Sequence, residues 1–375
     1  MTNAAGHPQT PRRAYLDTAS GEPLHPVARQ TLLAAIDRGY ADPRRLHGPA
    51  RDARLMLDNA RAVVAECLGV RADEVGFTHS GTEAVHRGLL GLVRDRRRRV
   101  VHPAVEHSAV IHAAAWGSEP DVVAVSGDGR VRAVDLVEQA AGGDVAAVAL
   151  QSANHEVGTV QPVDEVRLPD GVPLFVDACA SMGRLPLPGG WSVVAGSAHK
   201  WGGPAGVGVL VVRKGARWVN PFPGEQQLDE SATGFPNVPG ALAAAAALQA
   251  VVSERGTENA RQHALVDRVR HVVAALPDVE VVGSATERLP HLVTFSCLYV
   301  DGEALVSELD RHGFEVASGS ACTSSALEPS HVLAAMGALT HGNVRLSVGR
   351  ATDDGDVERF LAVLPGVLED LRARL

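Results

Sequence analysis

Short apolar runs alternate with helical patterns through the first two thirds of the chain, and this alternation limits the fold more than any other feature. The runs "VVHP", "VAAVALQ", "VPLFVD" and "VGVLVV" each end at polar or glycine residues. Upstream, "EVGFTHSGTEAVHRGLLGLVR" predicts a short strand, a Ser-Gly turn and a helix that starts near Thr82. Buried strands that alternate with helices are typical of α/β domains. We therefore predict an α/β fold with a mostly parallel sheet.

The pattern changes after an alanine-rich helix that is expected to begin in "NVPGALAAAAALQAVV". Beyond about residue 256 the periodicity restarts, which predicts a further helix through "HALVDRVRHVVAAL", strands at "VEVVG" and "HLVTFSC", and a final amphipathic helix after Asp353. Another helix is predicted over residues 54–68. We expect a large domain over residues 1–250 and a smaller α+β domain over residues 251–375. About the first 20 residues are a candidate to pack with the smaller domain.

Composition excludes several classes of function. The net charge of -9 argues against direct nucleic-acid binding, which needs a basic surface. The four consecutive arginines from Arg96 to Arg99 are interpreted as the solvated end of a helix. The sequence has neither an apolar stretch of about 18 residues nor an apolar secretory core near its start, which predicts a cytoplasmic protein that does not enter the membrane. The cysteines lie far apart, so their spacing predicts neither a disulfide framework nor a metal site; they are Cys67, Cys179, Cys297 and Cys322.

Four chemically different side chains follow the ends of four apolar runs. They are His107, Asn154, Asp177 and Lys200. Each alone has an ordinary interpretation, as a surface histidine, a turn former, a helix cap or a solvated cation. In open α/β sheets, however, binding sites gather where the carboxyl ends of the strands meet. Together the four residues predict one pocket.

Lys200 lies in "SAHKWGGPAG", among small and apolar residues. A lysine amine in a partly apolar pocket can form a Schiff base with an aldehyde. Pyridoxal 5'-phosphate is the aldehyde cofactor whose ring nitrogen needs an acidic partner, and Asp177 offers a carboxylate. His107 is a candidate to stack on the ring. The sequence therefore predicts a pyridoxal-phosphate site.

The phosphate of that cofactor needs an anion cradle. Gly81 and Thr82 open a predicted helix and offer backbone N–H groups, a hydroxyl group and the positive end of the helix dipole. Ser197 and His199, just before the lysine, are candidate further donors.

Several of these motifs resemble one family over nearly the full length of the chain. The lysine segment and the cysteine segment are the most specific of them; the motifs include "FTHSGTEA", "VEHSAV", "SANHEVGTVQPV", "VDACASMGRLPL", "SAHKWGGPAGVGVLVV", "SGSACTSSALEPSHVLAAMG" and "NVRLSVGR". The sequence resembles the cysteine desulfurases, in the class-V aminotransferase branch of the fold-type-I pyridoxal-phosphate enzymes. This resemblance implies a fold-type-I large domain, a smaller C-terminal domain and a two-fold homodimer with active sites near its interface.

The resemblance also implies a reaction. L-cysteine would be converted to L-alanine, and its sulfur would be left as a persulfide on Cys322, in a loop of small polar residues, for transfer to an acceptor protein that the sequence does not identify. Lys200 and His107 would complete the catalytic set. Arg345 would bind the substrate carboxylate with its planar fork, and Asn154 would lie beside the cofactor ring and that carboxylate. Arg350 is expected to form a structural ion pair.

This sequence departs from the family at the cofactor and at the dimer contact. Ala180 replaces a glutamine that donates to the cofactor's phenolic oxygen, while Ala232 and Phe235 align with an arginine and with a threonine that reaches the neighbouring subunit's phosphate. Two other hypotheses therefore stay open. One is a different pyridoxal-phosphate reaction, such as a C–S lyase, a selenocysteine lyase or a cysteine sulfinate desulfinase. The other is a non-catalytic protein with the same fold, against which the intact lysine, aspartate, histidine and cysteine argue.

Overall fold

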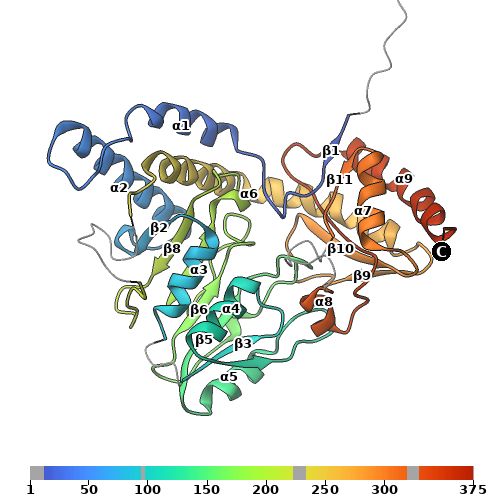
Figure 1. Cartoon of the computed structure of the whole chain (residues 1–375), viewed down its shortest axis with the longest axis horizontal. Coiled ribbons are helices and arrows are strands. Elements are labelled where there is room, and N and C mark those ends of the chain that lie inside the picture. Colours follow the sequence, from blue (N-terminus) through green and yellow to red (C-terminus); the bar gives the residue numbers. More distant parts are fainter. Residues whose placement is uncertain (1–11, 94–97, 223–233, 319–328, 375) are drawn as a thin grey trace, which may run out of the picture.

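The computed structural model describes residues 12–93, 98–222, 234–318 and 329–374. Its largest element is a seven-stranded sheet (Figure 1). In sheet order the strands are β2 (Val75–Thr78), β8 (Gly208–Val212), β7 (Val193–Ser197), β6 (Leu174–Asp177), β5 (Val145–Gln151), β3 (Arg99–Pro103) and β4 (Glu119–Val123). Strand β8 runs antiparallel to both of its neighbours, and the other pairs are parallel. The predicted α/β fold with a mostly parallel sheet is confirmed.

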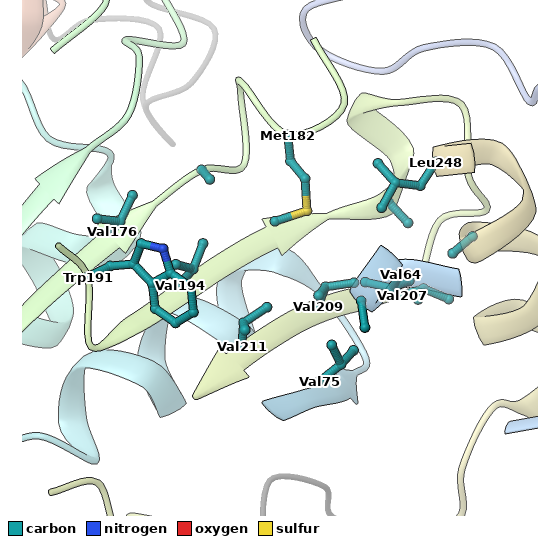
Figure 2. Packing of buried hydrophobic residues seen from close by; sticks show 14 of the residues in the cluster. Val64, Val75, Val176, Met182, Trp191, Val194, Val207, Val209, Val211 and Leu248 are labelled. Carbon is teal, nitrogen blue, oxygen red and sulfur yellow. The ribbon is translucent and has the colours of Figure 1, made fainter. Parts of the chain in front are cut away.

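Helices cover both faces of this sheet because successive strand residues point to opposite sides. Val193 and Ala195 pack in one apolar cluster with α3 and α4. Val194 packs on the other face, in a cluster that also holds Val64 of α2 and Leu248 of α6 (Figure 2). The helices of this part are α1 (Pro26–Ile36), α2 (Gly48–Leu68), α3 (Gly81–Leu90), α4 (Ser108–Gly117), α5 (Ala133–Ala141) and α6 (Val238–Val273). The helix predicted to start near Thr82 is α3, and the helix predicted over residues 54–68 begins earlier, at Gly48.

A second core lies around a smaller antiparallel sheet of order β12-β10-β9. The pair β1–β11 lies beside it, and Leu16 from the N-terminal segment is fully buried in this core. The elements are β1 (Ala14–Tyr15), β9 (Val279–Val282), β10 (Leu292–Cys297), α7 (Gly302–Arg311), β11 (Phe314–Glu315), α8 (His331–Met336), β12 (Asn343–Ser347) and α9 (Asp354–Arg372). The strands predicted at "VEVVG" and "HLVTFSC" and the final helix are confirmed.

Helix α6 is one continuous helix of 36 residues where the sequence predicted two. Its first half packs in the large core and its second half, through Leu265 and Val269, in the small core. Gly256 lies between the halves, and its α-carbon faces open space. A glycine inside a helix costs only about 1 kcal/mol, so burial of both halves outweighs it. The predicted boundary after residue 250 falls inside this helix, and the division into domains stays a prediction.

The interpretation of the arginine run as the end of a helix is wrong for its described members. Arg98 donates to the carbonyl of Val145 at 2.5 Å, and Arg99 begins β3 and pairs with Asp121. Within the described ranges, none of the helices combines the length and the apolar character needed to cross a membrane.

Candidate active site

A pocket of about 230 Å³ lies where four parallel strands of the large sheet end. The loops after β3, β5, β6 and β7 and the first turn of α3 form most of its wall, and Ser20 and Arg345 close it from the side of the small core. This is the edge at which open α/β sheets bind ligands. Of the residues predicted for the site, those that line the pocket are Gly81, Thr82, His107, Asp177, Ser197, His199, Lys200 and Arg345.

Lys200 ends a short 3-10 turn, η3 (Ala198–Lys200), directly after β7. Its Nζ donates to the carbonyl oxygens of Ala19 at 2.5 Å and Ser20 at 3.1 Å. The amine therefore lies at the pocket wall, held towards the N-terminal segment. A primary amine in such a position can attack an aldehyde in the pocket.

Asp177 is the last residue of β6 and is buried. One carboxylate oxygen accepts the backbone N–H of Cys179 at 2.9 Å. Burial raises the pKa of the Asp177 carboxyl, and the hydrogen bonds from Cys179 oppose this rise without cancelling it. A buried carboxyl of this kind is stabilised as an anion by a cationic partner, and the protonated ring nitrogen of pyridoxal phosphate fits that requirement.

The first turn of α3 lies against the loop after β7. Ser80 caps the helix by accepting the N–H of Glu83 at 3.0 Å. A β-carbon built on Gly81 would lie 2.5 Å from the β-carbon of Ser197 and 3.2 Å from the sulfur of Cys179, so only glycine fits here. The close approach brings the unpaired N–H groups of a helix N-terminus next to a serine hydroxyl group. This donor set fits a phosphate group.

His199 completes that wall of the pocket. Its Nδ1 lies 3.0 Å from the hydroxyl oxygen of Ser197. Burial and, to a smaller extent, the charge of Lys200 together lower the pKa of His199 to about 4. The neutral imidazole can therefore exchange a hydrogen bond with the serine or with a phosphate oxygen.

His107 caps α4, and its Nδ1 accepts the N–H of Ala109 at 3.0 Å. The other ring nitrogen, Nε2, must then carry the proton of the neutral ring. Burial lowers the pKa of His107 to about 3, and His155 and Lys200 act in the same direction. The ring of His155 packs edge-on against that of His107, with 4.7 Å between the ring centroids.

Asn154 does not line the pocket, although it lies beside it. Its amide nitrogen donates to the carbonyl of Val105 at 3.0 Å, and its oxygen accepts the N–H groups of Glu156 and Val157. The side chain thus shapes the loop after β5. Its contact with a cofactor or a substrate stays a prediction.

Arg345 lies on β12 and is buried. One terminal nitrogen donates to the carbonyl of His155 at 3.0 Å, and the other contacts Asp17 at 3.0 Å and the hydroxyl group of Ser20 at 2.5 Å. Its Nε has no partner among the described residues. The guanidinium is therefore held in place at the pocket, with one N–H available for an anion.

The sequence did not identify four polar residues of this pocket. These are Ser20, Gln151, His155 and Cys179. His155 and Cys179 each lie one or two residues from a predicted site residue, which is the signal that could have found them. Arg350 pairs with Glu254, so its expected structural ion pair is confirmed.

Two of the residues discussed for the cofactor, dimer and catalytic roles are not described. Cys322 and Ala232 lie in segments 319–328 and 223–233, outside the described residues. Ala180 lines the pocket at the position where the family has glutamine.

Comparison with known proteins agrees with this geometry. The family model described as aminotransferase class-V matches residues 14–360. An IscS-like cysteine desulfurase of Mycobacterium tuberculosis is 37% identical over 96% of this chain and 97% of its own length, and a cysteine desulfurase of Cereibacter sphaeroides is 35% identical over 96% and 97%. A solved NifS-like protein, 26% identical, superposes with a TM-score of 0.87 over 96% of this chain and 100% of its own. The chain therefore belongs to the class-V aminotransferase family, among the relatives that are cysteine desulfurases.

Proposed function

We propose that this protein is a pyridoxal-phosphate-dependent cysteine desulfurase, which converts L-cysteine to L-alanine and leaves the sulfur as a persulfide on Cys322. The observation that carries the proposal is the meeting of Lys200, Asp177 and Arg345 in one pocket at the carboxyl ends of parallel strands. The cysteine desulfurases at up to 37% identity support the same reaction. A sulfur-acceptor protein, not identified by the sequence, would take the persulfide sulfur.

The pocket fits the cofactor at three places. Lys200 would hold its aldehyde carbon, Asp177 its ring nitrogen, and the first turn of α3 with Ser197 its phosphate group. Pyridoxal phosphate supplies an electron sink that weakens the bonds around the substrate's α-carbon. Because Asp177 is buried, it would keep the ring nitrogen protonated without competition from water.

The remaining groups would bind the substrate and move its atoms. Arg345 would hold the α-carboxylate, and His107 would present the N–H of its Nε2 to the reacting groups. The thiolate of Cys322 would attack the substrate sulfur. A sulfur–sulfur bond then forms as the carbon–sulfur bond breaks, and the electron pair left on the β-carbon takes up a proton to give the methyl group of alanine.

The lysine assignment is open to an unusually direct test, because the sequence contains only one other lysine, Lys214. Lys214 is exposed, pairs with Asp73 and is not among the residues that line the pocket. We expect borohydride reduction followed by peptide mapping to place the pyridoxyl mass on Lys200. Lys200→Ala should lose alanine formation, whereas Lys214→Ala should keep it. A label on Lys214 would contradict the assignment.

The persulfide is tested by mass. Wild-type protein incubated with L-cysteine and no reductant should gain about 32 Da, one sulfur atom, on the peptide that contains Cys322. Cys322→Ser should release alanine slowly or not at all. If that variant makes alanine and sulfide at the wild-type rate, a C–S lyase reaction replaces the desulfurase reaction.

A cytoplasmic location and a two-fold homodimer are parts of the same proposal. The location follows from the sequence pattern alone. The dimer is supported by exposed apolar side chains on α1 and in the segment that joins α1 to α2, among them Leu33, Tyr40 and Leu46.

A further inference from the structure

Glu156 is a buried acid, just after His155, that the proposed reaction does not use. Its side chain is only 3% exposed. Burial alone would raise the pKa of this carboxyl, but contacts with His155 and Ser330 outweigh burial and lower it. Glu156 is therefore an anion in the interior, and such an anion needs partners that hold it in one geometry.

Two described side chains hold the Glu156 carboxylate. The hydroxyl group of Ser330 donates to Oε2 at 2.6 Å, and Nε2 of His155 lies 3.6 Å from Oε1. Ser330 also caps α8, since its Oγ accepts the N–H of Leu333 at 3.2 Å. The carboxylate thus connects the start of α8 to the pocket.

His155 connects this carboxylate to His107. With Nε2 facing Glu156, the proton of a neutral His155 ring is favoured on Nε2, and its Nδ1 has no hydrogen-bond partner within the described part of the chain. The rings of His155 and His107 pack in a T-shaped arrangement, and Nδ1 of His107 accepts the N–H of Ala109.

The start of α8 makes a second contact, with the residue that precedes His107. His331 follows Ser330, and its Nε2 lies 2.9 Å from the carbonyl oxygen of Glu106, the residue before His107. His107 and His155 are therefore each adjacent in sequence to a residue that the start of α8 contacts.

We propose that Glu156 is a positioning residue, which holds the ring of His155 and, through it, the ring of His107 in the orientation that the reaction needs. Ser330 holds Glu156 in turn. The kinetic part of this proposal rests on the proposed function, whereas its geometric part does not.

Glu156→Gln is the direct test because it keeps the size of the side chain and an oxygen that can accept from Ser330, but removes the charge that faces His155. The full chain, with ¹⁵N-labelled imidazole rings and no added cofactor, should show changed ¹⁵N shifts for His155 and His107 in this variant. With cofactor and L-cysteine, kcat should fall by about tenfold to 100-fold with a smaller change in KM, as expected for a misplaced ring rather than lost binding. Glu303→Gln, at an exposed position on α7, is the matched control and should change neither.

A second pair of variants keeps the test decisive if Glu156→Gln does not fold. Ser330→Ala should move the same two histidine resonances and lower kcat, and Ser330→Thr, which keeps the hydroxyl group, should restore both. Unchanged histidine shifts in Glu156→Gln or in Ser330→Ala would overturn the proposal, whatever the activity. If the shifts move but wild-type protein makes no alanine from cysteine, the positioning role holds and the proposed function fails.

Discussion

His107 lies where burial and neighbouring positive charge both oppose a second proton on its ring. Its pKa is lowered to about 3 in the folded protein from an ordinary value of 6.5. Between these values the unfolded chain binds a proton that the folded chain does not, so acid favours unfolding. Keeping this ring neutral, as the proposed reaction requires, therefore costs stability, and the cost grows as the pH falls.

We expect this cost to be measurable by substitution. His107→Asn keeps a side chain that can cap α4 but removes the titrating group. Between pH 7 and pH 5 the wild-type free energy of unfolding should fall by about 2 kcal/mol more than that of the variant, because the pKa difference acts on the wild type only. Urea unfolding of the cofactor-free chain at the two pH values measures this, with His341→Asn at an exposed position as the control. Equal pH dependence in wild type and His107→Asn would show that the ring is accessible to protons in the folded state.

The sequence predicted which site residues lie at the ends of strands. It did not predict the contacts that segments distant in the sequence make with them. His107, Asp177 and Lys200 lie at or shortly after the ends of apolar runs, so the order of elements already placed them together. The bond between Arg345 and Ser20 joins residues 325 positions apart, and no local pattern marks it. Such pairs follow from how the two cores pack, which the sequence does not display.

At the scale of elements, the approach of α3 to β7 forms the proposed phosphate cradle. The cradle depends on Gly81, where a β-carbon would overlap the side chain of Ser197. The turn "SGTE" was predictable because serine, glycine and a following acid mark a helix start. The close approach of this turn to the end of β7 was not predictable, because it depends on how α3 packs against that strand.

Gly81→Ala should therefore weaken binding of pyridoxal phosphate by tenfold or more. The added methyl group would push the first turn of α3 away from Ser197 and so displace the phosphate donors. Gly256→Ala is the matched control, since that glycine is exposed in α6 and has open space around it. The control should bind the cofactor normally and gain up to about 1 kcal/mol of stability from the better helix former. Absorbance titration of the cofactor-free proteins measures the affinity, and equal affinity for wild type and Gly81→Ala would refute the cradle.

At the scale of the whole molecule, two cores meet through α6 and enclose the pocket between them. The sequence predicted two helices here because "SERGTEN" is polar and contains a glycine. The polar run proves to be the partly exposed middle of one continuous helix (Figure 1), whose two halves pack in different cores. The sequence predicted helical structure in each half. Whether the two halves join into one continuous helix depends on tertiary packing, which the sequence does not show.

Helices α1 and α2 lie at the end of the molecule away from α9 (Figure 1), and exposed apolar side chains there are the surface that we expect a partner chain to cover. Leu46 is 88% exposed and Tyr40 is 66% exposed, in the segment that joins these helices. Large apolar side chains gathered on a surface mark an interface more often than a solvated face, and a homodimer is the state implied by the resemblance to cysteine desulfurases. We expect light scattering to give twice the 39.2 kDa mass of the chain.

Leu46→Glu would place a charge in that interface and should shift the protein towards the mass of one chain, because an unpaired buried charge is strongly unfavourable. Val134→Glu, at a position of α5 that is 51% exposed, is the matched control and should stay dimeric. Cofactor binding in both variants should be measured beside the mass, since active sites near the interface would lose affinity only in Leu46→Glu. If the wild-type chain is monomeric at micromolar concentration, or if Leu46→Glu stays dimeric, this surface is not the dimer interface.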